Sequence, residues 1–444
     1  MRKIGLAVLL AVAVGWLASF FFTLQQAKLL GIVTLLVTMW TNNALPLGVV
    51  SLLPILLFPA LGIIDVNHVT PNYAKSIIFL FIGGFMLAIA MQKSDLHLQI
   101  SNRLLRVFPH TARGILYAMA IVSALLSSIL SNTTITLMLM PIGLFITDNP
   151  KLKVRILLAI AYGASVGGIL TPIGTPPNLL LLGYLEEIGL QAPTFVEWMG
   201  MTAPVVVTML LVMPWILSRG VREESVGEVK QHPEPLTLPQ KKLLWIIGGL
   251  SLLLVLNTPV KPWYPGLGLN EKALLLGAGL LLFMPGIRLL DWEDSRAIPY
   301  EIIFLFGAGF VIARAFGSTG LAEALAQKLS FVHVLPLWMV LAVVALFVSF
   351  STEITSNTAL TSIALPVMAQ LYGIHHADTV LILMVTTIAA SYAFMLPIAT
   401  PPNAIIMSSR LIEVKTMAGF GFFIDLIGVL AVSVAAYTIW QWMV

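Results

Sequence analysis

The stretch Ser131-Asn132-Thr133-Thr134 decides how the rest of the chain is read, because most of it occurs twice. Its first three residues return as Ser356-Asn357-Thr358, 225 positions later. The same offset carries Thr175-Pro176-Pro177-Asn178 onto Thr400-Pro401-Pro402-Asn403, and the Ile-Ile-Phe-Leu-Phe run of 77–81 onto 302–306. One ungapped offset over about a hundred residues indicates two copies of a single structural unit.

The composition indicates a membrane protein. Of the 444 residues, 59% are hydrophobic and 10% are charged, whereas soluble domains carry about 25% charged residues. Apolar runs of about 20 residues recur, which is typical of transmembrane helices; a β-barrel would alternate apolar and polar residues. The chain has no cysteine, so it has no disulfide framework and no thiolate metal site. The net charge of +4 comes from Lys and Arg in short loops, which favours a role in topology over nucleic-acid binding.

The apolar runs predict eleven membrane-spanning helices in two halves, joined by a hydrophilic linker at 219–242. The expected helices cover 1–22, 29–41, 45–63, 75–92, 155–184 and 196–218, then 243–257, 271–287, 300–316, 378–408 and 417–442. The first run also fits a secretory signal peptide. It is long, has no clear cleavage site and is followed at once by further runs, so we expect it to be retained as helix 1.

Two apolar segments, 112–147 and 334–372, are interrupted by polar clusters at 127–134 and 351–358. A continuous span would bury these clusters in lipid, so each segment is predicted to form a re-entrant hairpin whose polar tip faces a cavity. Helices 5 and 10 are predicted to be broken at 171–178 and 396–403, where prolines prevent a continuous helix.

Two shorter segments, 92–109 and 320–335, have the pattern of amphipathic helices that lie in the membrane interface. In the first, apolar residues are interleaved with Lys and Arg. In the second, Leu321, Leu325 and Leu329 recur every four residues and share one side of a helix. We expect both segments to act as interfacial arms at equivalent positions of the two copies.

The distribution of positive charge predicts the orientation. With the N-terminus in the cytoplasm and each hairpin returning to its own side, 18 of the 24 Lys and Arg residues are cytoplasmic. The C-terminus then lies outside. Five spans separate equivalent helices, an odd number, so the two copies have inverted topology. The predicted fold is an all-α polytopic membrane protein with two inverted-topology repeats, eleven transmembrane helices and two re-entrant hairpins.

Paired broken helices in inverted repeats are the signature of a secondary transporter with its site near the bilayer midplane. A broken helix leaves carbonyl groups free at one stump, which suit a small cation, and N–H groups at the other, which suit a carboxylate. A single Ser/Thr pair is usually bonded to its own helix, and a Pro-Pro pair is usually a simple loop. Duplication at one offset favours the functional interpretation. Neither tip carries Lys or Arg, so bound cations would supply the charge opposite an anion.

The two Ser-Asn-Thr tips and the two Thr-Pro breaks resemble the divalent anion–sodium symporter family, over nearly the whole chain. The resemblance implies Na⁺-coupled symport of a small di- or tricarboxylate. It implies one Na⁺ held by Ser127, Ser131, Asn132 and Gly174, and a second held by Thr352, Thr355, Asn357 and Ala399. It implies substrate contacts at Asn132, Thr133, Thr175, Asn357, Thr358, Thr400 and Pro401. Thr355 stands where a smaller residue is expected, which changes little if its carbonyl is the ligand.

The family also implies a homodimer in which a mobile transport domain moves against a scaffold as an elevator. The scaffold would comprise 1–110 and 243–333, with helices 1–4 and 7–9 and both arms. The transport domain would comprise 111–218 and 334–444, with the hairpins and helices 5, 6, 10 and 11. Residues 219–242 would form the cytoplasmic linker, and the arms would be the hinged connections.

Several alternatives stay open at this level. Some relatives are Na⁺-independent exchangers, and a sulfate carrier would use the same neutral donors. An ion channel would need a continuous pore. An enzyme is disfavoured because no catalytic set is apparent, and the scattered histidines do not suggest a metal site. Three ionisable residues lie within predicted membrane segments. Glu353 could shape the cation site or have a capping role, Arg314 could be a snorkelling or paired structural charge, and Asp425 could couple a proton or charge. We expect a multi-pass protein of the cell membrane, in a bacterium the inner membrane.

Overall fold

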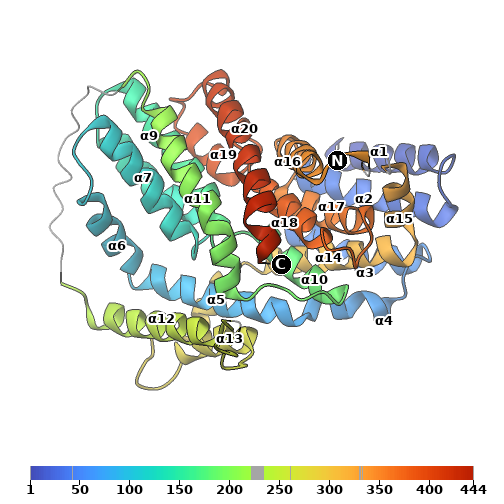
Figure 1. Cartoon of the computed structure of the whole chain (residues 1–444), viewed down its shortest axis with the longest axis horizontal. Coiled ribbons are helices and arrows are strands. Elements are labelled where there is room, and N and C mark those ends of the chain that lie inside the picture. Colours follow the sequence, from blue (N-terminus) through green and yellow to red (C-terminus); the bar gives the residue numbers. More distant parts are fainter. Residues whose placement is uncertain are drawn as a thin grey trace.

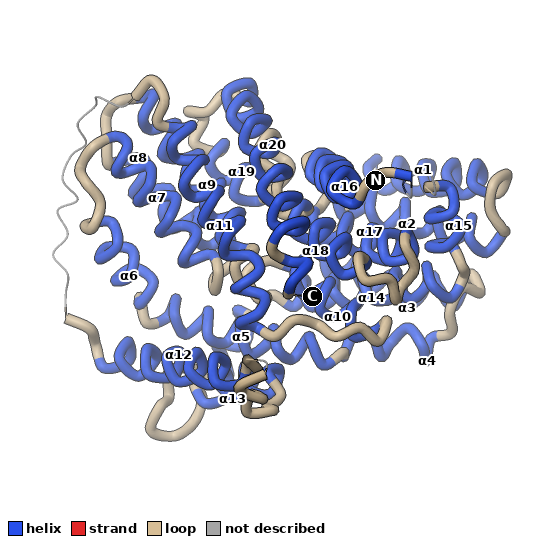
Figure 2. Tube along the Cα trace, in the orientation of Figure 1, coloured by secondary structure: helices blue, strands red, loops and turns tan. Residues whose placement is uncertain are grey.

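A computed structural model describes residues 2–42, 44–221, 235–260, 262–329, 332 and 334–443. In this part of the chain the structure consists of helices and loops without a strand, apart from one isolated bridge between Val260 and Tyr264 (Figures 1 and 2). The predicted all-α class is therefore confirmed. Helix α5 runs along the long axis of the molecule, and α6 and α15 lie at opposite ends (Figure 1).

The helices of the first half follow the predicted order. They are α1 (Arg2–Ala18), α2 (Leu24–Asn42), α3 (Leu47–Ala60), α4 (Val66–Val69), α5 (Ser76–Lys93), α6 (Leu96–Leu105), α7 (Ala112–Ser127), α8 (Asn132–Phe145), α9 (Pro150–Gly168), α10 (Pro176–Glu187) and α11 (Phe195–Leu217). A short 3₁₀ helix, η1 (Thr70–Ala74), joins α4 to α5. The first hairpin segment is thus two short helices, and predicted helix 5 is divided into α9 and α10.

The second half repeats this order. It contains α12 (Leu238–Asn257), α13 (Glu271–Leu281), η2 (Trp292–Ala297), α14 (Tyr300–Ser318), α15 (Leu321–Lys328), α16 (Leu337–Thr352), α17 (Asn357–Leu371), α18 (Thr379–Ala389), α19 (Pro401–Met407), α20 (Val414–Thr438) and η4 (Trp440–Trp442). Predicted helix 10 is divided into α18 and α19.

Helix boundaries recur at the offset of 225 residues seen in the sequence. α7 and α16 begin and end at equivalent residues, and α8 and α10 begin at the equivalents of the first residues of α17 and α19. The turns that lead into the two arms also match, because Asp95 and Gly320 both adopt left-handed backbone, with φ of 55° and 67°. Glycine and aspartate tolerate this conformation better than most residues. The sequence repeat is therefore also a repeat of local structure.

Several predicted boundaries are wrong. Predicted helix 1 ends at Ala18 and not at residue 22, and predicted helix 2 begins at Leu24 and not at residue 29. The linker was expected to reach residue 242, but α12 begins at Leu238, because Thr237 and Gln240 form a capping box that starts the helix there. Residues 222–234 of the predicted linker lie outside the described part of the chain. The predicted helix 271–287 ends at Leu281, ahead of a turn in which Gly286 has a φ of 90°.

Within the described residues, five helices are long and apolar enough to cross a membrane. They lie in 66–93, 195–217, 238–257, 300–318 and 414–442. Shorter apolar helices include α3, α7, α8, α16 and α18. These lengths fit a multi-pass membrane protein in which the hairpin helices are only part of a span long. The eleven-span topology stays a prediction.

Helix packing near the hairpins is close because glycine faces a neighbouring backbone. A Cβ atom on Gly167 of α9 would collide with the backbone of Ala124 on α7. A large apolar cluster joins α5, the hairpin helices and α9–α11, α18 and α20, and a second cluster joins α1–α3 to α14 and α15. The hairpin tips are thereby fixed against the helix breaks.

Candidate transport site

The first tip lies between α7 and α8 and is organised by three side chains. The Ser127 hydroxyl, at the C-terminus of α7, donates to Asn132 Oδ1 at 2.6 Å. Ser131 is the N-cap of α8, and its Oγ accepts from the Thr134 N–H at 3.2 Å. Ser127 is fully buried, whereas Asn132 is half-buried. Because Asn132 Oδ1 is held by Ser127, the amide NH₂ group is left to donate elsewhere.

The first helix break exposes the last carbonyl groups of α9, and side chains satisfy them. Asn178 Nδ2 donates to the carbonyl oxygens of Gly168 and Thr171, at 3.1 and 2.9 Å. The carbonyls of the two residues that follow Gly168 are also bonded. Trp198 Nε1 donates to the Ile169 carbonyl at 3.0 Å, and the Thr202 hydroxyl donates to the Leu170 carbonyl at 3.2 Å. These groups would otherwise be unpaired at a helix end in an apolar environment. Four successive carbonyl groups of the break are therefore hydrogen-bonded to side chains.

The first tip and the first break meet. A Cβ atom on Gly168 would lie 3.0 Å from Asn132 Oδ1 and 3.3 Å from Thr175 Cβ. A Cβ atom on Gly174 would collide with the Gly168 carbonyl. The Thr171 hydroxyl also donates to the Ser128 carbonyl at the tip. Ser127, Asn132, Gly174 and Thr175, which the sequence predicted as site residues, are therefore brought together by the fold.

The second tip repeats this arrangement at equivalent residues. The Thr352 hydroxyl lies 2.6 Å from Asn357 Oδ1, to which it donates, and 3.0 Å from the Ala390 carbonyl at the end of α18. Thr361 donates to the Asn357 carbonyl at 2.7 Å, as Thr136 does to the Asn132 carbonyl at 2.8 Å. The Asn357 amide is therefore oriented as Asn132 is, with its NH₂ group unpaired in the described part of the chain.

The second break is also closed by an asparagine. Asn403 Nδ2 donates to the Ala393 and Leu396 carbonyls, each at 3.0 Å, and these are the equivalents of Gly168 and Thr171. The contact between the second tip and the second break uses a carboxylate, where the first half uses the Thr171 hydroxyl. Glu353 accepts the N–H groups of Met395 and Leu396, at 2.7 and 2.8 Å. These N–H groups belong to the irregular segment of the break, where no helix begins, so the contact of Glu353 observed here is with backbone of the break.

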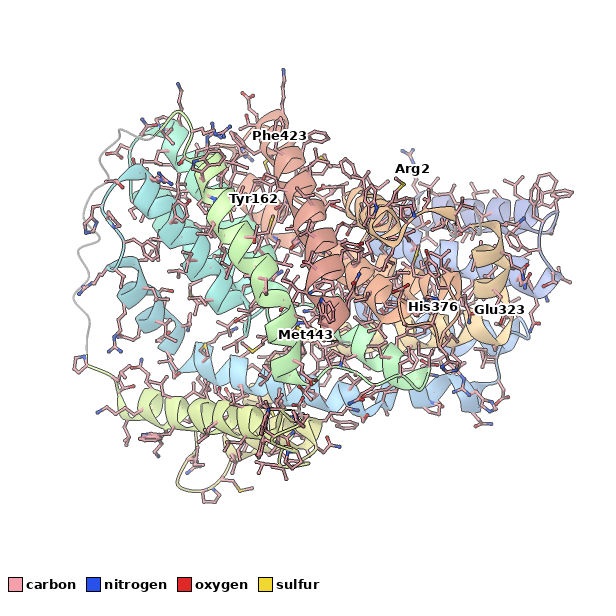
Figure 3. The ribbon with its side chains drawn as sticks, viewed as in Figure 1. Arg2, Tyr162, Glu323, His376, Phe423 and Met443 are labelled. Carbon is pink, nitrogen blue, oxygen red and sulfur yellow. The ribbon has the colours of Figure 1, made fainter. Side chains whose placement is uncertain are left out.

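The two halves interlock around these breaks. α8, which begins at the first tip, packs against α19 of the second break, and α10 of the first break packs against α17 of the second tip. Tyr162 of α9 donates to the Phe394 carbonyl at 2.8 Å, so the first half also supports the second break. Figure 3 labels Tyr162 within the group formed by α7, α9, α11 and α20.

A family model described as a citrate transporter matches residues 32–390. The chain belongs to the citrate transporter family. The expected resemblance to the divalent anion–sodium symporters is confirmed by two relatives of similar length. The sodium-dependent dicarboxylate transporter SdcS of Staphylococcus saprophyticus is 30% identical over 92% of this chain and 85% of its own. SdcS of Staphylococcus aureus is 30% identical over 95% of this chain and 88% of its own.

A solved structure shows the same fold. The YdaH transporter of Alcanivorax borkumensis superposes with a TM-score of 0.57, at 14% identity, over 84% of this chain and 86% of that chain. The similarity in sequence is too low to carry more than the architecture. It agrees with the placement of the chain in the citrate transporter family.

The remaining predicted site residues of this citrate transporter family member lie at the same tips and breaks. Thr133 is half-buried in the first turn of α8, and Thr358 is buried in the first turn of α17. Thr175 is the N-cap of α10 but its side chain makes no cap hydrogen bond, so its hydroxyl is available as a donor. Thr355 donates its hydroxyl to the Ser351 carbonyl at 2.8 Å. Ala399 and Thr400 are buried, and Pro401 is exposed at the start of α19.

Sequence reasoning missed the role of Asn178 and Asn403. Both belong to the repeated Thr-Pro-Pro-Asn segments, and both are fully buried donors to two carbonyls. A signal was present, since a helix broken in an apolar environment needs donors for its last carbonyls. Arg314 is exposed on α14 and forms no ion pair in the described part of the chain, which favours the snorkelling alternative over the paired one.

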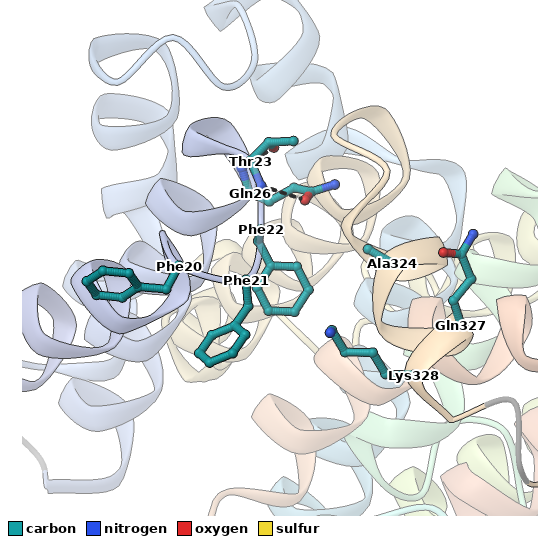
Figure 4. Close-up of a pocket in the computed structure, with 8 residues that line it drawn as sticks. All are labelled: Phe20, Phe21, Phe22, Thr23, Gln26, Ala324, Gln327 and Lys328. Carbon is teal, nitrogen blue, oxygen red and sulfur yellow. Dashed lines mark hydrogen bonds between the residues drawn. The ribbon is translucent and has the colours of Figure 1, made fainter.

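An open pocket of about 570 Å³ lies away from this site, between the α1–α2 turn and α15 (Figure 4). Phe20, Phe21, Phe22 and Lys328 are among its lining residues, and Lys328 Nζ is 5.4 Å from the centre of the Phe22 ring. None of the predicted site residues lines it. The candidate site rests on the paired tips and breaks, because they carry the polar groups that a cation and a carboxylate need.

Proposed function

We propose that the chain is a Na⁺-coupled symporter of a small di- or tricarboxylate. The observation that carries the proposal is the duplicated constellation, in which a hydroxyl fixes the asparagine of each tip at 2.6 Å. Each asparagine then offers oxygens to a cation on one side and N–H donors to a carboxylate on the other. The names of the SdcS relatives, sodium-dependent dicarboxylate transporters, support the same substrate and coupling ion.

In this proposal Na⁺ binds first at each tip and completes the anion site. The first ion contacts Ser127, Ser131, Asn132 and Gly174; the second contacts Thr352, Thr355, Asn357 and Ala399. The substrate carboxylates contact the Asn132 and Asn357 amides and the hydroxyls of Thr133 and Thr358, with Thr175, Thr400 and Pro401 lining the site. Because neither tip carries a cationic side chain, the ions supply the charge opposite the anion, and each ligand raises the affinity for the other.

An elevator movement is the proposed mechanism of alternating access. Residues 111–218 and 334–444 would move as the transport domain, and 1–110 and 243–333 would form the scaffold of a homodimer. The left-handed turns at Asp95 and Gly320, where each arm begins, support a hinge at both connections. Eleven spans with the N-terminus in the cytoplasm and the C-terminus outside complete this proposal.

The test is uptake of radiolabelled succinate into proteoliposomes that contain no substrate, with and without an inward Na⁺ gradient. Uptake that requires Na⁺ and is lost in Asn132→Ala and Asn357→Ala is the expected result. A matched control is Asn149→Ala, which removes an N-cap of α9 away from the tips. Uptake that requires preloaded dicarboxylate and ignores Na⁺ would instead identify an exchanger.

A further inference from the structure

A cleft of about 550 Å³ lies between the end of α11 and the start of α20, and none of the predicted site residues lines it. The two helices pack together and run antiparallel, since at their other end Trp440 Nε1 donates to the Met201 carbonyl at 2.8 Å. Figure 3 labels Phe423 near the cleft and Met443 at the opposite end of this helix pair. Both helices are long and apolar enough to cross a membrane. A cleft at the end of two such helices opens where the hydrocarbon core of a bilayer meets its headgroups.

The walls of the cleft are largely apolar and aromatic. Trp215 and Ile216 line it from α11, and Phe420, Phe423 and Ile427 line it from α20. Phe423 is 60% exposed, so part of this apolar surface is open to the surroundings of the protein. Aromatic side chains at the end of a membrane span lie at the depth where acyl chains join their headgroups. The walls are therefore suited to a hydrocarbon chain.

Three cationic side chains accompany the aromatic walls. Arg219 Cζ lies 3.9 Å from the centre of the Trp215 ring, and Cζ of Arg155, on α9, lies 3.6 Å from the centre of the Phe420 ring. Lys415 lines the cleft from the first turn of α20 and is exposed. None of these three cations forms an ion pair with a described residue. Their positive charge is therefore available to an anion that enters the cleft.

Two further groups at this end of the helices lack a hydrogen-bond partner. The N-cap of α20, Glu413, makes no side-chain hydrogen bond to the first N–H groups of the helix. Nη1 of Arg155 is buried and has no partner in the part of the chain that the structure describes. Guanidinium groups and the first N–H groups of a helix both favour phosphate. The chemistry of this end of the cleft is thus that of a phosphate site.

The cationic cluster is confined to one copy of the repeat. At the offset of 225 residues the equivalents of the three cations are apolar: Val380, Leu190 and Val444. In the predicted orientation the cluster lies on the cytoplasmic side, where anionic lipids give the membrane a negative surface potential. The charge therefore complements one face of the membrane and is not part of the duplicated tips and breaks.

We propose that the cleft between α11 and α20 binds one anionic phospholipid. Arg219 and Lys415 hold its phosphate, and an acyl chain lies along Trp215, Phe420 and Phe423. A free phosphate ion would use the cations but leave the aromatic walls exposed, whereas a phospholipid uses both. The bound lipid joins the end of α11 to the start of α20 and so stabilises the folded protein. The inference does not depend on the proposed transport function.

The experiment measures the unfolding temperature of the purified, delipidated full-length protein in detergent as lipid is added. Phosphatidylglycerol, which is anionic, should raise this temperature. Phosphatidylcholine, which is zwitterionic, and inorganic phosphate should not. Arg219→Gln/Lys415→Gln should weaken the apparent affinity for phosphatidylglycerol by about tenfold or more, because each cation near a membrane surface adds to the attraction for anionic lipid. Phe423→Ala should weaken it as well, since it removes an exposed part of the apolar wall.

The matched control is Arg106→Gln/Lys151→Gln, which removes one Arg and one Lys that are exposed and form no ion pair among the described residues. This control should bind phosphatidylglycerol as the wild type does. An equal loss in the control would assign the effect to general surface charge and refute the site.

Other results would also overturn the proposal. Equal stabilisation by phosphatidylcholine would remove the role of charge, and equal stabilisation by inorganic phosphate, unchanged in Phe423→Ala, would identify a free anion site. A wild-type affinity of Arg219→Gln/Lys415→Gln would show that the lipid binds elsewhere. If this double variant does not fold, Phe423→Ala and the comparison of the three additives decide. These readouts are independent of uptake, so a protein that binds the lipid but takes up no succinate would refute the proposed function alone.

Discussion

Replacing Asn178 or Asn403 by alanine should open the helix break that each residue closes. Each side chain is fully buried and donates to two carbonyl groups at the end of a half-helix, at distances of 2.9–3.1 Å. Alanine removes both donors, and the site has no second donor to replace them. Because the hydrogen-bond partners are equivalent, the two variants should be destabilised by similar amounts.

The magnitude follows from the two bonds lost. Hydrogen bonds between helices in membrane proteins contribute about 0.6 kcal/mol each on average, so two give a lower estimate of about 1 kcal/mol. If both carbonyls stay buried and unpaired, the loss is about 1–3 kcal/mol for each, or up to about 6 kcal/mol. The break also holds Gly168 against the Asn132 amide, so Asn178→Ala should weaken Na⁺ binding at the first tip as well.

The assay is thermal unfolding in detergent, followed by Na⁺ titration of the variants that fold. Asn149→Ala, which loses two N-cap bonds of α9, calibrates the loss expected from a site outside the breaks, about 1 kcal/mol. If Asn178→Ala and Asn403→Ala unfold at the temperature of the wild type, water or backbone movement satisfies the carbonyls. The two hydrogen bonds would then not be what stabilises each break.

Three further predictions concern ion binding, packing and a surface ion pair. Ser127→Ala and Thr352→Val should each weaken the apparent affinity for Na⁺ by about tenfold, or ~1.4 kcal/mol, because each removes one oxygen from a tip. Gly167→Ala should destabilise the protein by about 1–3 kcal/mol or more, since its Cβ meets the backbone of α7 and no rotamer relieves the contact. Burial opposes ionisation of Asp294, but hydrogen bonds from Lys93 and a backbone N–H outweigh it and lower the pKa of the carboxyl group. Asp294→Asn should therefore lose up to about 1 kcal/mol at neutral pH, and this difference should vanish as pH falls below about 4.

Each of these has its own contradicting outcome. Ser127→Thr keeps the hydroxyl and should retain Na⁺ affinity; equal losses in Ser127→Ala and Ser127→Thr would point to packing. A wild-type unfolding temperature for Gly167→Ala would mean that α7 and α9 separate easily. If the loss of stability in Asp294→Asn persists at acid pH, the loss does not come from the ion pair with Lys93, whose Nζ lies 2.6 Å from the carboxylate.

Sequence patterns with a local physical cause predicted much of this protein. Long apolar runs predicted helices, and prolines predicted breaks, because both effects act within a few residues. The linker boundary failed for a local reason that the apolar pattern does not report, the capping box at Thr237. The repeated Ser-Asn-Thr and Thr-Pro-Pro-Asn segments predicted which residues form the tips and breaks, since their common offset relates two copies of one unit.

The tertiary structure decided which groups meet. Ser127 and Asn132 are five residues apart, but their contact with Gly168 and Gly174 depends on how α7 packs on α9. Tyr162 and Phe394 are 232 positions apart in sequence, and only the packing of the two halves brings the Tyr162 hydroxyl to 2.8 Å from the Phe394 carbonyl. The sequence shows which side chains are polar within an apolar chain. Whether such a group has a partner depends on neighbours from distant helices, and these are fixed only when the helices pack.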